Sequence, residues 1–158
     1  MVILGIDPGT RISGFGILKK ESNRSFLLES GCLKLNPTTD LKDRISQFHN
    51  FFEEKVEKFQ ITDLALETPF LGKNAQNFLK LGYLRGILYL VASKHKMKIH
   101  EFSPREIKQA VTGFGGASKE QVSRMMLQFF PGIKVSGTLD VTDALAVTLC
   151  GLWRYRRL

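Results

Sequence analysis

The order of strand and helix patterns along this chain limits its fold more than any other feature. Three short runs that favour strands come first, at residues 2–6, 13–18 and 26–33, with turn residues at Pro8-Gly9 and around residues 21–24. Apolar and β-branched runs bounded by such turn residues are typical of strands. Because both connections are short, the sequence predicts an antiparallel meander.

Helical and strand patterns alternate after the third run. A helix is predicted at residues 41–59, where apolar side chains recur at helical spacing. A fourth strand ending at Glu67, a long helix over about residues 74–96 and a fifth strand at 99–102 follow. Strands that alternate with helices add to a sheet in parallel, with helices on its faces. The sequence therefore predicts an α/β fold with a five-stranded mixed sheet, three antiparallel strands and then parallel additions, flanked by helices.

Capping signals mark the helices of the C-terminal third. Ser103-Pro104-Arg105-Glu106 has the pattern of a capping box with proline at the first helical position, and Gly113 ends that helix. Ser118 begins a second box, whose helix runs to Phe130, and a last helix follows from Asp140. The 158 residues are 43% hydrophobic and contain no repeat or linker, so residues 1–158 are expected to form a single domain.

Two of the predicted strands end in an acidic residue. Asp7 follows the first apolar run and precedes Pro8-Gly9, while Glu67 ends the fourth strand and precedes Thr68-Pro69. A carboxylate mounted at the end of a buried strand needs a cation or hydrogen-bond donors to hold its charge. Taken alone, Asp7 could equally begin a β-turn.

Asp140 and Asp143 form a second acidic pair. Residues three apart share one face of a helix, so these two like charges point the same way. The alternative is that they only complement the helix dipole, as acids in a first turn do. As a set, the four carboxylates suit Mg²⁺ or Mn²⁺, which prefer oxygen ligands. Two such ions about 3.5–4 Å apart activate a water and stabilise the leaving oxygen of a phosphodiester, so the set predicts metal-dependent phosphodiester hydrolysis.

The charge balance indicates the class of substrate. The formal net charge is +8, which favours polyanions because Lys and Arg that neutralise phosphates release counterions. A merely basic surface is the alternative. A basic chain with an acidic cluster is typical of a protein that attracts nucleic acid to a metal centre.

Four segments, in order, resemble the bacterial RuvC family of Holliday-junction resolvases, over about residues 1–152: Gly5-Ile6-Asp7-Pro8-Gly9-Thr10, Glu67-Thr68-Pro69-Phe70-Leu71-Gly72-Lys73-Asn74-Ala75, Leu79-Lys80-Leu81-Gly82-Tyr83-Leu84-Arg85-Gly86 and Asp140-Val141-Thr142-Asp143-Ala144-Leu145-Ala146. The resemblance implies an RNase H-like fold and a homodimer that cuts two opposed strands of a four-way DNA junction, in recombination and repair. It also implies Mg²⁺ as cofactor, with Mn²⁺ expected to substitute, and the RuvAB branch-migration complex as a partner.

The resemblance also assigns roles to residues. It implies that the catalytic, metal-binding carboxylates are Asp7, Glu67, Asp140 and Asp143. An aromatic matching Phe70 stacks on an unpaired junction base in the family; the alternative is that Phe70 folds back into the core. The candidates for phosphate contact are Lys73, Arg85, Lys108, Lys119 and Arg124. Among them Lys108 and Lys119 match family lysines near the scissile phosphate.

Gly82 and Gly86 lie inside the predicted long helix, where each costs about 1 kcal/mol relative to alanine. Glycines four residues apart permit a close approach of another backbone. That approach is either by a second copy of the chain or by the protein's own sheet. The resemblance implies that this helix lies at or near a dimer contact.

Three other functions compete with junction resolution. Gly5-Ile6-Asp7-Pro8-Gly9-Thr10 also resembles the first phosphate loop of actin-like and sugar-kinase ATPases, but those need two such lobes and this chain has room for one. A junction-binding module that is catalytically weak would bind DNA without cutting it. A resolvase-like family of RNA-processing nucleases shares the early Asp motif.

The two cysteines, Cys32 and Cys150, lie far apart and outside any Cys-x-x-Cys spacing, so we expect reduced thiols and neither a zinc site nor a disulfide. Met1 leads directly into a strand pattern, and no apolar stretch reaches about 18 residues. The sequence therefore predicts a cytoplasmic protein that does not contact membranes.

Overall fold

A single five-stranded sheet forms the centre of the molecule, whose computed structural model describes residues 1–69, 74–133 and 139–154. Its strands are β1 (Val2–Asp7), β2 (Ile12–Glu21), β3 (Arg24–Lys34), β4 (Asp63–Glu67) and β5 (Lys98–Phe102). The order across the sheet is β3-β2-β1-β4-β5. The first three strands pair antiparallel, and β4 and β5 add in parallel, as the short and long connections predict.

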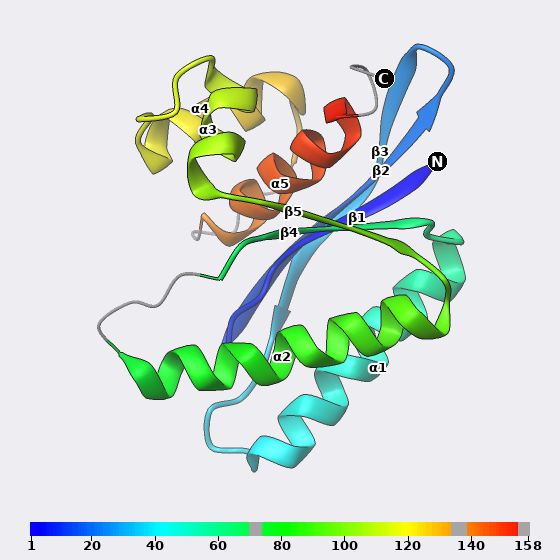
Figure 1. Cartoon of the computed structure of the whole chain (residues 1–158), viewed down its shortest axis with the longest axis vertical. Coiled ribbons are helices and arrows are strands. Elements are labelled where there is room, and N and C mark those ends of the chain that lie inside the picture. The colour runs from blue at the N-terminus through cyan, green and yellow to red at the C-terminus, as the bar shows by residue number, and fades with distance from the viewer. Residues whose placement is uncertain (70–73, 134–138, 155–158) are drawn as a thin grey trace.

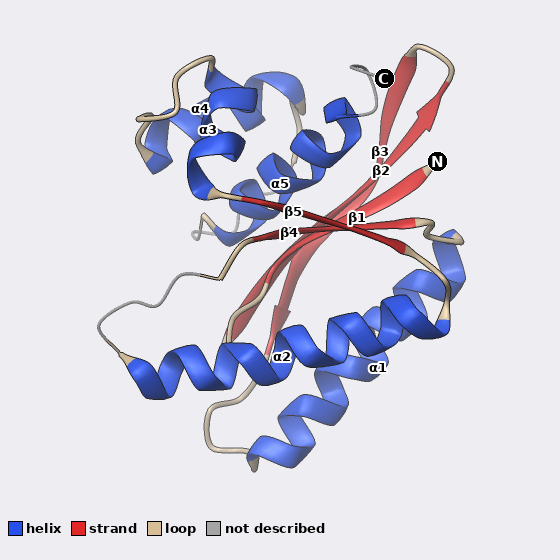
Figure 2. Cartoon of the chain, in the orientation of Figure 1, coloured by secondary structure: helices blue, strands red, loops and turns tan. Residues whose placement is uncertain are grey.

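Helices cover both faces of this sheet, as Figure 1 shows. On one face lie α1 (Leu41–Phe59) and α2 (Ala75–Lys94), and on the other lie α3 (Pro104–Thr112), α4 (Lys119–Phe129) and α5 (Asp140–Arg154). Each face has its own core: Phe48, Phe52 and Leu88 belong to the first, and Met126 and Leu145 to the second. The predicted α/β architecture is confirmed (Figure 2). No helix in the described ranges is both long and apolar enough to cross a bilayer.

The predicted helix boundaries are confirmed where capping residues set them. The Ser103 and Ser118 hydroxyls each accept a backbone N–H at the third helical position, and both capping boxes are complete. Gly113 adopts φ 78°, a left-handed conformation that glycine tolerates without strain. These local signals are sufficient because every partner lies within a few residues along the chain.

The β2–β3 hairpin is longer than its apolar pattern predicts. The ladder continues from Ile12↔Lys34 to Glu21↔Arg24, so each strand extends beyond residues 13–18 and 26–33. The added residues at the turn end are polar and mostly exposed. Backbone pairing needs no apolar side chain, so a pattern of apolar residues does not mark these extensions.

Glycines in the sheet let α5 lie directly on it. A Cβ built on Gly14 would overlap the main-chain carbonyl of Asp140, and one on Gly5 would overlap the Thr148 side chain. Gly14 is also the cross-strand partner of Asp7. Asp7 and the first turn of α5 are therefore brought together by a β2 position that has no side chain.

Candidate active site

Three elements bring the four predicted carboxylates to one place. Asp7 and Glu67 end β1 and β4, which pair in parallel up to Ile6↔Leu66, so both acids stand at the same edge of the sheet. Asp140 and Asp143 occupy the first turn of α5, and the backbone of Asp140 rests on Gly14. Strand ends and a helix start therefore meet where the sequence predicted a metal site.

Asp7 is the most strongly perturbed of these acids. Its pKa is raised from 3.8 to about 7, first because burial disfavours the charged carboxylate and then because Asp143 and Glu67 repel it. Lys119 opposes this shift, and Asp140 adds a smaller repulsion. The site thus holds more negative charge than the side chains around it neutralise.

Lys119 and Lys108 are the cations that act on this cluster from α4 and α3. The Lys119 Nζ donates to Asp143 Oδ2 at 3.0 Å, and that bond raises the pKa of the lysine. Burial and the charge on Asp143 raise the pKa of Glu67, while Lys119 and Lys108 lower it. Lys108 and Lys119, which match family lysines near the scissile phosphate, therefore lie close enough to act on the carboxylates.

Arg85 differs from the expectation of an exposed phosphate contact. Its side chain on α2 is buried, and the residue is 7% exposed. The guanidinium donates to the Glu67 carbonyl at 2.7 Å, to the Tyr89 hydroxyl at 3.1 Å and to the Glu101 carboxylate. Arg85 thus ties the end of β4 to α2 and β5, and little of it is left to meet DNA.

Two cavities flank the acids. One of about 350 Å³ lies against Asp7 and Glu67, walled by α2 residues including Arg85. The other, of about 670 Å³, borders Asp140 and is lined by cations that our sequence interpretation did not select, Arg11, Arg44 and Lys80. Both share Pro8 and Leu81, so together they flank the carboxylate cluster on two sides. Arg11 directly follows the Asp7 motif in sequence, which was an available signal; the approach of Arg44 on α1 was not.

The remaining predicted site residues have mixed outcomes. Phe70 and Lys73 lie outside the described residues. Arg124 is on the exposed side of α4. A Cβ on Gly82 or Gly86 would meet nothing within 4 Å, so these glycines do not pack against the protein's own sheet.

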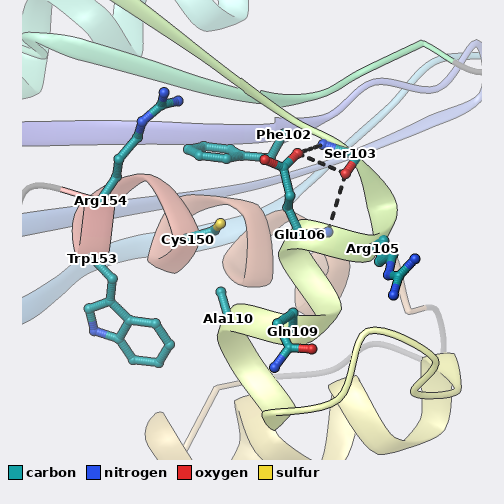
Figure 3. A pocket seen from close by; sticks show the side chains of 9 residues that line it. All are labelled: Phe102, Ser103, Arg105, Glu106, Gln109, Ala110, Cys150, Trp153 and Arg154. Atoms are coloured by element: carbon teal, nitrogen blue, oxygen red, sulfur yellow. Dashed lines mark hydrogen bonds between the residues drawn. The ribbon is translucent and has the colours of Figure 1, made fainter. Parts of the chain in front are cut away.

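A further cavity, of about 800 Å³, lies between α3 and α5, and apolar side chains form much of its wall. Figure 3 shows Phe102, Ala110 and Trp153 around it, with the Glu106 carboxylate turned back to cap Ser103. Cys150 lines this cavity, and burial raises the pKa of its thiol to about 11, so it stays protonated. Cys32 and Cys150 are both free thiols, as expected. This cavity does not contain the four acids.

The chemistry of the acidic cluster fits a hard divalent cation. All four donors are carboxylates, and burial, followed by repulsion from Asp143 and Glu67, raises the pKa of Asp7. In the described part of the chain, the group of three ligand residues whose atoms lie within 4.8 Å of one another is found elsewhere, at Glu53, Glu57 and His95. The four carboxylates of the acidic cluster do not meet this distance, and a cation bound among them would offset the repulsion that Asp143 and Glu67 exert on Asp7.

The pKa of Asp7 also predicts how stability depends on pH. Between about 4 and 7 the folded state binds a proton that the unfolded state has released, so the free energy of unfolding of the metal-free protein falls as pH rises. A shift from 3.8 to about 7 corresponds to about 4 kcal/mol. We expect Asp7→Asn to remove most of this decline in urea unfolding at pH 5 and pH 8. Glu54→Gln, an exposed acid on α1, is the matched control and should retain the decline. A wild-type stability that rises over this range would contradict the assignment.

The carboxylates, the lysines and the sheet order can now be compared with known proteins. The family model described as "Crossover junction endodeoxyribonuclease RuvC" matches residues 3–151. The RuvC of Pelodictyon phaeoclathratiforme is 41% identical over 98% of this chain and 81% of its own length. That of Legionella pneumophila (strain Philadelphia 1) is 37% identical over 94% of this chain and 85% of its own.

A solved structure agrees with these relatives. The structure of T. thermophilus RuvC in complex with Holliday junction substrate superposes with a TM-score of 0.89 and 27% sequence identity, over 99% of this chain and 96% of that one. The sheet and its flanking helices are therefore those of an RNase H-like resolvase. With a family model matched along nearly its whole length, the chain belongs to the RuvC family of crossover junction endodeoxyribonucleases.

Proposed function

We propose that this protein is a structure-selective endonuclease that resolves four-way DNA junctions by paired, symmetric phosphodiester hydrolysis during recombination and repair. The observation that carries the proposal is the meeting of Asp7 and Glu67 with the first turn of α5, inside a fold matched by RuvC along nearly its whole length. Membership of the RuvC family favours this function over an ATPase or an RNA-processing nuclease.

The proposed cofactor is Mg²⁺, with Mn²⁺ able to replace it, held by Asp7, Glu67, Asp140 and Asp143. When bound, such ions neutralise the carboxylates, activate water for attack on phosphorus and stabilise the leaving oxygen. Lys119, already 3.0 Å from Asp143, is placed to move its ammonium from that carboxylate to a non-bridging phosphate oxygen. Lys108 would act on the same phosphate from α3.

Cations beyond the carboxylates extend the proposed DNA surface. Arg11, Arg44 and Lys80 line the polar cavity next to Asp140 and would hold the phosphates of the strand leaving the site. The Arg44 guanidinium also donates to the Thr10 carbonyl at 3.3 Å, which holds it beside the segment that carries Asp7. Phe70 and Lys73 retain their proposed roles in base stacking and phosphate contact, and Arg124 remains a candidate for a more distant phosphate.

The substrate and ion requirement are tested together on a synthetic mobile four-way junction. With Mg²⁺ we expect two nicks at symmetric positions and little cutting of linear duplex. Ca²⁺, which is larger and tolerates more ligands, should support junction binding but little hydrolysis. Strand mapping on denaturing gels and a binding titration give the two readouts.

Each of the other outcomes of this experiment would indicate a different function or mechanism. Equal turnover in Ca²⁺ and Mg²⁺ would count against a site that demands octahedral geometry. Random nicking of linear duplex would indicate a general nuclease. Tight junction binding with no cleavage in Mg²⁺ or Mn²⁺ would indicate a binding module.

A homodimer is the proposed working form, and the outer face of α2 is its proposed contact. Leu79 and Leu90 are 56% and 59% exposed there, and Tyr83 is also exposed. With Gly86 they follow a spacing of four, three and four residues, which places them along one stripe of the helix. A Cβ on Gly82 or Gly86 would meet nothing within 4 Å in the same chain, so the backbone at these positions is open to close approach by a second α2. Two such subunits supply the two carboxylate sets that paired cuts require.

We expect Leu90→Lys to convert the dimer to a monomer of 17.9 kDa in size-exclusion chromatography with light scattering. Two buried leucines are lost per symmetric contact, so association should weaken by at least about a hundredfold. The paired nicks should then become single. Leu127→Lys replaces an exposed leucine on α4 and is the matched control, which should stay dimeric. A wild-type monomer, or dissociation by Leu127→Lys alone, would refute this contact.

Family membership also supports two wider proposals. The RuvAB branch-migration complex is the proposed partner at the junction, and the bacterial cytoplasm, where chromosomal junctions arise, is the proposed location. Co-sedimentation on junction DNA with the purified RuvAB proteins would test the first, and cell fractionation the second.

A further inference from the structure

A second cluster of metal-ligating side chains lies away from the carboxylates of the active site. Two of the chain's three histidines, His49 and His95, converge on one glutamate, Glu53, which projects from α1. The His95 Nε2 lies 3.0 Å from Glu53 Oε1, and the His49 Nε2 lies 4.0 Å from Glu53 Oε2. Glu57, one turn further along α1, completes the group: ligand atoms of Glu53, Glu57 and His95 all lie within 4.8 Å of one another.

The spacing on α1 explains why these side chains meet. His49, Glu53 and Glu57 follow one another at intervals of four residues, so they stand above one another on one face of the helix. His95 caps the end of α2. Figure 1 shows the C-terminal ends of α1 and α2 together at one side of the molecule, while β1 and β4 end toward the other side. The cluster is thus separate from the proposed catalytic centre.

Glu53 gives the second, independent indication of a ligand. It is 9% exposed, and its Oε2 is buried with no hydrogen-bond partner among the described residues. A buried carboxylate oxygen without a partner is costly, and a cation in contact with it removes that cost. Its Oε1 is held by Lys94 and His95.

The donor set selects the class of ion. We propose that Glu53, Glu57 and His95, with His49 as a fourth ligand, bind a transition-metal dication of the Zn²⁺ type that joins α1 to the end of α2. Imidazole suits Zn²⁺ and its neighbours, whereas Mg²⁺ prefers oxygen ligands and retains its waters. Two histidines and two carboxylates also match the four-coordinate sites that Zn²⁺ forms. The ammonium of Lys94 holds Glu53 in the absence of the ion, and its side chain, 60% exposed, is free to turn outward when the ion binds.

The proposal is tested with Co²⁺ as a spectroscopic probe and Zn²⁺ as competitor, on the full chain carrying Asp7→Asn to weaken the other metal centre. We expect visible absorption from one Co²⁺ per chain, abolished by one equivalent of Zn²⁺ and unaffected by millimolar Mg²⁺. His95→Gln and Glu57→Gln should each weaken the affinity at least about tenfold, since loss of an outer partner alone costs that much. Glu54→Gln, next to the cluster on α1 but not part of it, should leave the affinity unchanged.

Thermal unfolding supplies a readout that does not depend on the spectrum. Zn²⁺ should raise the unfolding midpoint of the parent chain and raise that of Glu57→Gln by clearly less at the same Zn²⁺ concentration, because the exposed Glu57 side chain contributes little to the metal-free fold and the variant binds the ion more weakly. Absence of a Co²⁺ band, or equal affinity in all variants, would overturn the site. Because no DNA or cleavage enters these measurements, their result is independent of the proposed nuclease function.

Discussion

Asp7→Asn is expected to reduce junction cleavage by at least about a thousandfold while junction binding stays equal or becomes tighter. The amide keeps the shape of the side chain but removes an anion and a metal ligand from the most charge-crowded position of the site. A loss of about 4 kcal/mol of transition-state stabilisation corresponds to a factor of that size. Binding should survive because one negative charge fewer faces the phosphates.

The measurement is single-turnover cleavage in Mg²⁺ beside a binding titration in Ca²⁺. Asp143→Asn should behave in the same way and also weaken the 3.0 Å bond from Lys119, because the amide oxygen accepts it without a negative charge. Glu54→Gln, which removes an exposed acid on α1 and changes the net charge by the same amount, serves as the control for a general change in charge. Normal cleavage by either Asp variant in Mg²⁺ would show that the carboxylate assignment is wrong.

Gly14→Ala is expected to slow cleavage by about a hundredfold although Gly14 has no side chain to contact DNA or metal. A Cβ there would overlap the carbonyl of Asp140, so the start of α5 must move away from Asp7. A displacement of about 1 Å among catalytic groups costs a factor of that order. The strain should also lower the free energy of unfolding by about 1–3 kcal/mol.

The matched control is Gly31→Ala on β3, where the new methyl would meet only the Phe15 ring, at 3.3 Å. It should cut normally and lose little stability. Urea unfolding of both variants at one pH separates the two effects, and junction binding should persist in both. Full activity of Gly14→Ala would show that the sheet does not set the spacing between Asp7 and Asp140.

Residues with local partners were predicted correctly from sequence. The capping boxes at Ser103 and Ser118 place α3 and α4 because each cap bonds a backbone group three residues away. The helix at residues 41–59 has the predicted bounds because its apolar repeat is regular over its whole length.

Roles that depend on distant neighbours were not predictable in the same way. Nothing in the sequence indicated that Arg85 would be buried, yet packing turns its side chain toward the Glu67 carbonyl and Glu101. Arg44 and Lys80 are far apart in sequence but line one cavity beside Asp140. Sequence distance carries no information about such encounters, since the sheet order and helix packing create them.

The sequence by itself determined the strand and helix order and the helix caps, because periodicity, capping and turn chemistry act over a few residues, and it predicted the four acids as one site. Only the tertiary structure decided that Gly14 would seat Asp140 beside Asp7, and that His95 would reach Glu53. Both contacts join segments more than forty residues apart. Their geometry follows from how closely α5 lies on the sheet and how α1 meets the end of α2, which are properties of packing.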